Sequence, residues 1–220
     1  MKMQSFKDVV SLEELNSQAR SQEIAHDKEG KLLREITGNI KRTMRKRDLI
    51  SLSAPGIGYN KRIFCIDFSD QEIKSFINPV ISNAEGLQLV REQCSSIPGK
   101  EFLVPRNTII DLYYETPTGL IKTKRFKDVV AFVIQHEMNH LEGVTLEDIG
   151  LEVDSDFDEA TEEEKQEIIE MYLDSLDLRQ RYLDEAIQED DELKMVADRL
   201  RFIEALAKGE VAFEENEEQE

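Results

Sequence analysis

The chain has 220 residues, with 28 Lys and Arg against 47 Asp and Glu, a formal net charge of −19, three histidines and two cysteines. It contains no apolar run long enough to span a membrane and no recognisable signal peptide, which excludes a membrane-spanning protein and predicts a cytoplasmic one. Two cysteines without a secretory signal also argue against a disulfide framework.

The charge is distributed unevenly along the chain. Residues 1–150 carry 21 basic and 21 acidic side chains, whereas residues 151–220 carry 7 and 26 and hold the whole excess of −19. The length suffices for one core domain and an extension. We therefore expect a domain over residues 1–150, an acidic helical extension over 151–208 and a disordered acidic tail over 209–220.

The first half of the chain has the pattern of an α+β domain. Apolar residues at helical spacing predict an amphipathic helix from Lys31 to Arg47. Its last part, residues 41–47, is a basic patch, which is either a solvated helix face or a contact for RNA. Thr116–Gly119 has the composition of a hairpin turn. Short strands separated by turn residues are predicted over 61–68, 76–81, 86–91, 108–115 and 119–125.

An apolar, helix-compatible stretch over residues 129–134 leads into the run Gln135-His136-Glu137-Met138-Asn139-His140. On a helix, side chains four residues apart lie on one face, so His136 and His140 can reach one metal ion. Glu137 then projects beside them toward a water on that metal, which is the arrangement of the H-E-x-x-H pattern. A catalytic site of this kind needs a third protein ligand and one open position.

The candidates for the third ligand are His26, Cys65, Cys94 and many carboxylates. Cys65 lies in an apolar strand pattern and is expected to pack in the core, and His26 lies in a polar segment and is expected at the surface. Cys94 lies in a polar, turn-rich stretch without an obvious packing role, which favours it as the ligand. One thiolate and two imidazoles suit Fe(II), Zn(II), Co(II) or Ni(II). With Glu137 as the proton carrier, such a site would hydrolyse an amide.

The acidic end of the chain is expected to be helical. Thr161 and Glu164 have the spacing of a capping box. Residues 188–192 separate two amphipathic patterns and could form a bend, which would give a hairpin docked on the core or on a partner. The tail disfavours nucleic acid nearby and would suit a basic partner. The first apolar stripe is Ile169, Tyr172, Leu176 and Leu183, and the second is Leu193, Val196, Leu200, Ile203 and Ala207.

Three segments, in this order, resemble the signature motifs of the peptide deformylase family. They are Leu52-Ser53-Ala54-Pro55-Gly56-Ile57-Gly58, Glu92-Gln93-Cys94-Ser95-Ser96 and Gln135-His136-Glu137-Met138-Asn139-His140-Leu141-Glu142-Gly143. Residues 77–79 and 104–106 also fit, so the resemblance covers about residues 30–150. It implies an α+β, peptide-deformylase-like fold, with small mixed antiparallel sheets around a central metal-binding helix and a C-terminal helical extension.

The resemblance also implies a function and a set of site residues. The reaction would be removal of the N-formyl group from the N-terminal methionine of nascent proteins, so formyl-methionyl peptides and the ribosome are the expected partners. One Fe(II) or Zn(II) ion would be held by Cys94, His136 and His140, with Glu137 as general base and the backbone N–H of Ser95 as an oxyanion donor. The implied substrate-binding residues are Ile50, Ser51, Glu92, Gln93, Val129, Phe132 and Val133. Arg106 would pair with a group under the metal helix or form an ordinary surface ion pair.

Several positions depart from the family pattern. Gly56 replaces a glutamine whose amide helps to hold the oxyanion, and losing one such donor typically costs about 10²–10³ in turnover. Ser51 replaces a glycine, Ser53 an alanine, and Asn139 an aspartate beside the metal ligands. Two other functions therefore remain open. The chain could hydrolyse another acyl amide, or it could be a weakly active homologue that binds a partner through its acidic helical tail.

Overall fold

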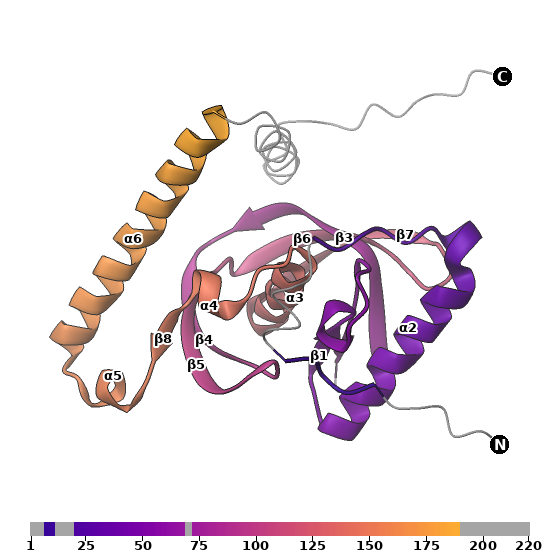
Figure 1. The fold of residues 1–220 in the computed structure, drawn as a ribbon, viewed down its shortest axis with the longest axis horizontal. Coiled ribbons are helices and arrows are strands. Elements are labelled where there is room, and N and C mark those ends of the chain that lie inside the picture. The colour runs from indigo at the N-terminus through magenta and orange to yellow at the C-terminus, as the bar shows by residue number, and fades with distance from the viewer. Residues whose placement is uncertain (1–6, 12–19, 69–71, 190–220) are drawn as a thin grey trace.

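Helix α3, Asp128–Leu141, lies at the centre of the molecule between two antiparallel β-sheets (Figure 1). The computed structural model describes residues 7–11, 20–68 and 72–189, with side chains described through residue 176. The first sheet has the order β1-β2-β3-β6-β7 and consists of Ser51–Ser53, Ile63–Asp67, Ile73–Glu85, Ile109–Glu115 and Ile121–Lys127. The second has the order β4-β5-β8 and consists of Gln88–Cys94, Ile97–Arg106 and Leu151–Val153.

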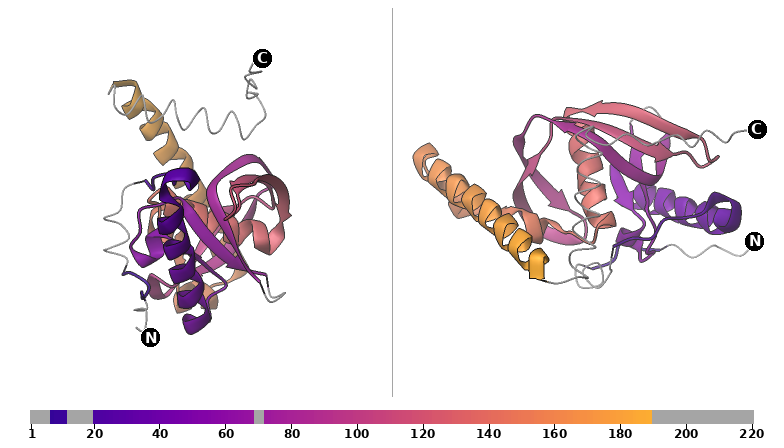
Figure 2. Two further views of the ribbon diagram at one scale, coloured as in Figure 1. Left: turned by 90° about the vertical axis from the view of Figure 1, so that its right-hand side faces the viewer. Right: turned by 90° about the horizontal axis from the view of Figure 1, so that it is seen from above.

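The remaining elements surround these sheets. Helix α2, His26–Arg47, packs on the outer face of the five-stranded sheet, and a 3₁₀ turn, η1 (Pro55–Ile57), follows β1. The helices at the C-terminal side are α4, α5 and α6, over Leu146–Ile149, Ser155–Glu159 and Glu162–Glu189. Helices α6 and α2 lie at opposite ends of the molecule (Figures 1 and 2).

The alternation of side chains along β2 produces two hydrophobic cores, one on each face of the sheet. Ile63 and Cys65 point toward α2 and join its buried residues, whereas Phe64 and Ile66 point toward α3. Successive residues of a strand face opposite sides, so a strand covered on both faces is apolar throughout. Burying this continuous apolar run between two helices fixes the position of α3 relative to the sheet.

Most predicted elements are present, but their limits differ. The five predicted strands correspond to β2, β3, β4, β6 and β7, and the hairpin turn is confirmed by a hydrogen bond of 2.9 Å from Gly119 N to Thr116 O. Helix α2 begins at His26, five residues before the prediction. The sequence pattern missed β1, β5 and β8. In β5, Pro98 and Pro105 obscured the strand, and the structure accommodates both because β8 pairs only with residues 101–103.

The two ligand candidates that were set aside lie away from the metal helix motif. Cys65 is fully buried in β2, which confirms its core role. The surface position expected for His26 is wrong, because its side chain is only 22% exposed and its Nε2 lies 2.8 Å from Glu115 Oε2. This pair attaches the start of α2 to the end of β6, so His26 has a structural partner.

The start of the extension agrees with its sequence pattern. Thr161 and Glu164 form the expected capping box, with 2.8 Å from Thr161 N to Glu164 Oε2. Tyr172 is buried and its hydroxyl donates to the carbonyl of Ile149, which ties α6 to the domain. The side chain of Leu183, the second apolar stripe and the tail over 209–220 lie outside the described residues. In the part of the chain that is described, no helix is long and apolar enough to cross a membrane.

Gly150 gives a test of the packing between the small sheet and α4. A Cβ at this position would lie 2.7 Å from the Leu146 carbonyl oxygen and 2.8 Å from Phe102 Cβ. We expect Gly150→Ala to lower the free energy of unfolding by about 1–3 kcal/mol through overpacking, measured by urea denaturation. Gly38→Ala is the matched control in α2, because its nearest neighbour would be Arg42 at 3.7 Å. It should raise stability by about 0.5–1 kcal/mol, and equal effects of both changes would contradict the packing argument.

Candidate metal centre

Two elements far apart in the sequence bring the candidate ligands together. Helix α3 presents His136 and His140 from successive turns of one face, toward the second sheet. Strand β4 ends at Cys94, which pairs with Ile97 across a two-residue turn at the start of β5. The strand places Glu92 and Cys94 against α3, where Glu92 contacts His136 and Cys94 contacts His140.

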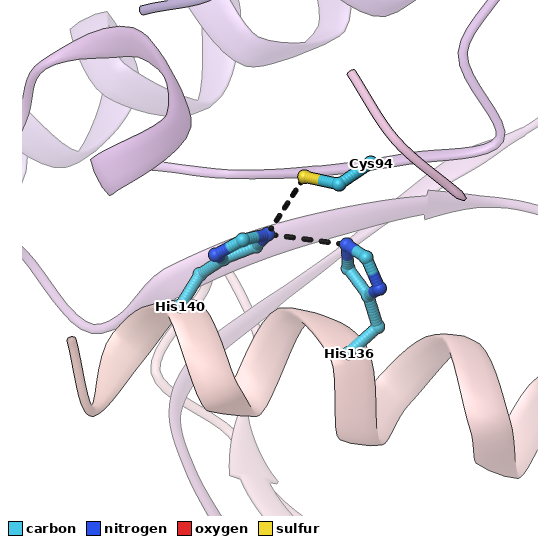
Figure 3. Close-up of side chains that lie close together, drawn as sticks. All are labelled: Cys94, His136 and His140. Atoms are coloured by element: carbon cyan, nitrogen blue, oxygen red, sulfur yellow. Dashed lines mark hydrogen bonds between the residues drawn. The ribbon is translucent and has the colours of Figure 1, made fainter. Parts of the chain in front are cut away.

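The three ligand atoms are close enough to share one cation. Cys94 Sγ lies 3.4 Å from His140 Nε2, which lies 3.1 Å from His136 Nε2 (Figure 3). All three atoms lie within 4.8 Å of one another. Around a tetrahedral ion with ordinary metal–sulfur and metal–nitrogen bonds, such atoms would be separated by about 3.4–3.6 Å. The donor set therefore fits one divalent metal ion of the kind that accepts thiolate and imidazole ligands.

A buried ion pair between Arg106 and Glu92 orients the ring of His136. Arg106 donates two hydrogen bonds to Glu92, of 2.7 and 2.8 Å, and Glu92 Oε2 lies 2.9 Å from His136 Nδ1. Arg106 also donates to Asn139 Oδ1, so it does pair with a group of the metal helix and is not at the surface. Because Nδ1 donates to Glu92, Nε2 is the ring nitrogen that faces the candidate cation position.

Burial and charge give the two imidazoles opposite protonation behaviour. Burial by itself lowers the pKa of His136, but hydrogen bonding to Cys94 and Glu92 outweighs it and raises the pKa to about 10. Burial and the neighbouring positive His136 lower the pKa of His140 to about 3. Burial opposes the ionisation of Glu92, yet Arg106 and His136 lower its pKa to about 2. Glu92 is therefore a permanent anion, able to compensate positive charge at this end of the cleft.

Glu137 has the properties of a proton acceptor held inside the protein. Its side chain is 3% exposed, and burial raises the pKa of its carboxyl against the opposing influence of His136. Ser51 Oγ donates a hydrogen bond of 2.6 Å to Oε1. The other oxygen, Oε2, is buried without a hydrogen-bond partner among the described residues. A buried carboxylate oxygen without a partner is costly, which is consistent with a water or substrate atom binding there.

A cleft of about 810 Å³ opens above these groups. Ile50 and Val129 are 66% and 69% exposed at this cleft, so Val129 is not a core residue. Phe132 is 9% exposed, and Ser95 lies in the turn that follows Cys94. The cleft wall contains all the expected site residues, namely Ile50, Ser51, Gly56, Glu92, Gln93, Cys94, Ser95, Val129, Phe132, Val133, His136, Glu137 and His140.

The contacts of several site residues could not be read from their motifs. Gln93 hydrogen-bonds to Glu101 on β5, and Glu92 is occupied by Arg106 and His136. Gly56 is buried in η1, and a Cβ there would lie 3.0 Å from Leu52 Cδ1 and 3.5 Å from Ser53 Oγ. The sequence analysis assigned no role to the Ser53 hydroxyl, which is buried near Glu137 and helps to lower the pKa of its carboxyl. The position of Ser53 in the first motif was the only sign in the sequence that this residue lies near the site.

Comparison with known proteins gives one consistent result. The sequence profile of the family described as polypeptide deformylase matches residues 6–150. A protein named peptide deformylase from Dictyoglomus turgidum is 36% identical over 110 residues, which cover 50% of this chain and 71% of that protein. Another, from Karelsulcia muelleri, is 37% identical over 134 residues, or 58% of this chain and 70% of that protein.

Solved structures agree with the sequence matches. A peptide deformylase from Synechococcus elongatus in complex with actinonin is 28% identical, with a TM-score of 0.59 over 68% of this chain and 81% of that one. A peptide deformylase from Thermotoga maritima is 24% identical, with a TM-score of 0.61 over 66% of this chain and 98% of that one. The expected peptide-deformylase-like fold, with antiparallel sheets around a central helix and an added C-terminal helix, is confirmed.

The two cysteines should differ in reactivity. Burial raises the pKa of the Cys65 thiol to about 12, so that almost none of it is ionised at pH 8. We expect iodoacetamide at pH 8 to label the folded, metal-stripped protein at Cys94 only, measured by peptide mass spectrometry. Loading the protein with Zn(II) or Ni(II) beforehand should suppress the label, and Cys94→Ser should take up none. Labelling of Cys65 at a rate comparable to Cys94 would contradict this assignment.

Proposed function

Because the chain belongs to the polypeptide deformylase family, we propose that it removes the N-formyl group from the N-terminal methionine of nascent proteins. The products are formate and a peptide with a free α-amino group, with water supplying the added oxygen and hydrogens. The single observation that carries this proposal is the convergence of Cys94, His136 and His140 beside the buried carboxylate of Glu137. The family matches do not favour the alternatives of another acyl-amide substrate or a mainly partner-binding homologue.

In this proposal Cys94, His136 and His140 hold one divalent ion, with Fe(II) or Zn(II) as the first candidates and Ni(II) or Co(II) as further ones. Such an ion lowers the pKa of a bound water toward neutrality. Both imidazoles must be neutral to bind the ion, so His136, whose pKa is raised to about 10, would give up its Nε2 proton when the ion binds. Glu92 fixes the Nδ1 proton of His136 at 2.9 Å, and the low pKa of His140 keeps that ring neutral.

Glu137 then acts as general base and general acid. Its buried carboxylate takes a proton from the attacking water and returns it to the nitrogen of the methionine as the C–N bond breaks. Its raised pKa makes it a stronger proton acceptor than an ordinary carboxylate. The backbone N–H of Ser95, in the turn after Cys94, is assigned to the oxyanion. Gly56 provides no side-chain amide for this purpose.

The cleft supplies the binding site for the formyl-methionyl group. Four apolar side chains, Ile50, Val129, Phe132 and Val133, are assigned to the methionine side chain, and their presence in the lining of the cleft supports this. Ser51, Glu92 and Gln93 line the same cleft near the scissile bond. We further propose that the catalytic domain predicted over residues 1–150 also includes β8, Leu151–Val153, because this strand pairs with β5 in the second sheet. The helical extension then follows β8 up to residue 208, with the acidic tail over 209–220.

Formate release gives the direct test. The anaerobically metallated protein should release formate from a formyl-methionyl peptide, and Glu137→Gln should lower kcat by about 10²–10⁴ because the proton carrier is lost. Glu85→Gln, the same change at an ion-paired glutamate on β3, is the matched control and should leave kcat unchanged. Metal content is measured for each protein. Release no faster than buffer from a fully metallated wild-type protein would refute the function.

We also propose that the protein works at the ribosome and that its two ends contact different components. On α2, Lys31, Arg34 and Arg45 are exposed and form no ion pair within the described part of the chain, a surface suited to RNA phosphates. Residues 151–220 carry the net charge of −19 and suit a basic protein. Helices α2 and α6 lie at opposite ends of the described molecule, which supports this division (Figure 2).

Cosedimentation with ribosomes separates the two contacts. Lys31→Glu with Arg34→Glu and Arg45→Glu should weaken binding at least tenfold and reduce its dependence on salt, because RNA phosphate contacts release counterions. Deleting residues 161–220 should weaken binding independently while formate release is retained. A matched control changes Lys74, Lys122 and Lys124 to Glu, lysines near one another on another surface. Equal loss with the control and the α2 variant would refute a specific contact.

A further inference from the structure

Glu137 has a hydrogen-bonding partner that comes from a distant part of the chain. Ser51 is the first residue of β1 and lies 86 positions before Glu137, yet its Oγ donates to Glu137 Oε1 at 2.6 Å. Strand β1 is held at the edge of the sheet by pairing of Ser51 with Ile66 on β2. The hydroxyl is therefore presented to α3 from a fixed backbone and does not depend on a mobile loop.

This contact makes the two oxygens of the carboxylate unequal. Oε1 is occupied by Ser51, whereas Oε2 is buried and has no hydrogen-bond partner among the described residues. A glutamate carboxylate can rotate about its last bond with little preference, so without this hydrogen bond the plane of the carboxylate could turn and its free oxygen would have no fixed direction. A hydrogen bond to a charged acceptor is stronger than one between neutral groups, which makes it suitable for stopping that rotation.

Ser53 is the other hydroxyl of β1 that lies near the carboxyl. It is fully buried and helps to lower the pKa of Glu137, but its Oγ does not form a hydrogen bond of ordinary geometry with any described residue. The ligand candidates His136 and His140 are engaged with Glu92, Cys94 and each other. Ser51 therefore forms the short, direct hydrogen bond to Glu137, at 2.6 Å, and Ser53 contributes more weakly.

We propose that Ser51 is a positioning residue that commits Glu137 to a single proton-accepting oxygen, Oε2. The proposal rests on the deformylase function, because it concerns the proton carrier of that reaction. During turnover Oε2 takes the proton from water and gives it to the leaving nitrogen, while Ser51 keeps its own proton and its bond to Oε1. Ser51 therefore affects the rate of the chemical step and has little effect on substrate binding.

Three variants and one control test this assignment. Ser51→Ala removes the hydroxyl, Ser51→Gly also removes the Cβ, and Ser51→Thr retains a hydroxyl at a strand position that favours a β-branched residue. Ser82→Ala is the control, since Ser82 is another half-buried strand serine, whose Oγ donates at 3.2 Å to the Asp111 carbonyl and lies outside the cleft. All are assayed for kcat and KM on a formyl-methionyl peptide, and their crystal structures are determined.

We expect Ser51→Ala and Ser51→Gly to lower kcat by about 10–100-fold with KM changed less than about threefold, as for a partial loss of general-base catalysis. Ser51→Thr should restore kcat to within about threefold of wild type, and Ser82→Ala should match wild type. In the crystal structures Glu137 should occupy one rotamer in the wild type and Ser51→Thr, but more than one in Ser51→Ala.

Three results would overturn the positioning role. They are wild-type kcat in Ser51→Ala, equal impairment in Ser51→Thr and Ser51→Ala, or an unmoved, singly placed Glu137 in Ser51→Ala. If Ser51→Ala does not fold, the comparison of kcat between Ser51→Gly and Ser51→Thr still tests the positioning role, because only Ser51→Thr retains the hydroxyl. Failure of the deformylase function is recognised separately, by a metallated wild-type protein that releases no formate at all.

Discussion

The ion pair between Arg106 and Glu92 is the interaction on which the geometry of the site depends. Both side chains are nearly excluded from solvent, at 4% and 10% exposure, and the guanidinium binds the carboxylate through two nitrogens. Removing one partner of such a pair leaves an uncompensated buried charge, which typically costs about 3–5 kcal/mol. The ion pair therefore holds the end of β5 against β4. It also keeps Glu92 in position to accept a hydrogen bond from His136.

The same network explains how the chain accommodates a neutral residue at Asn139. Its amide oxygen accepts a hydrogen bond from Arg106, so the position still contacts the guanidinium without contributing a charge. Glu92 is then the sole described anion that binds Arg106, and the low pKa of its carboxyl follows from that pairing with the help of His136. Asn139 therefore keeps a hydrogen bond with Arg106, while the positive charge of Arg106 is compensated by the Glu92 carboxylate.

The first motif differs from the family pattern at three positions near Glu137, namely Ser51, Ser53 and Gly56. Gly56 removes a polar side chain from one side of the cleft, while Ser51 and Ser53 add hydroxyls on β1. A Cβ at Gly56 would lie 3.0 Å from Leu52 Cδ1, so this strand and η1 are packed closely around the smaller residue. The added hydroxyl of Ser51 is directed to Glu137 and not to open solvent. The surroundings of the proton carrier have therefore changed, while the cluster of thiol and imidazole groups is complete.

The sequence alone determined the helix of His136, Glu137 and His140, most of the strands and the family, because these depend on local periodicity and motif spacing. It did not determine β5, whose prolines are tolerated only where β8 is absent, nor the half-buried pairing of His26 with Glu115. It also left open the partner of Arg106 and gave no sign that Ser51 bonds to Glu137. Those contacts join residues between 14 and 89 positions apart, and only packing of the sheets around α3 brings the groups within hydrogen-bonding distance.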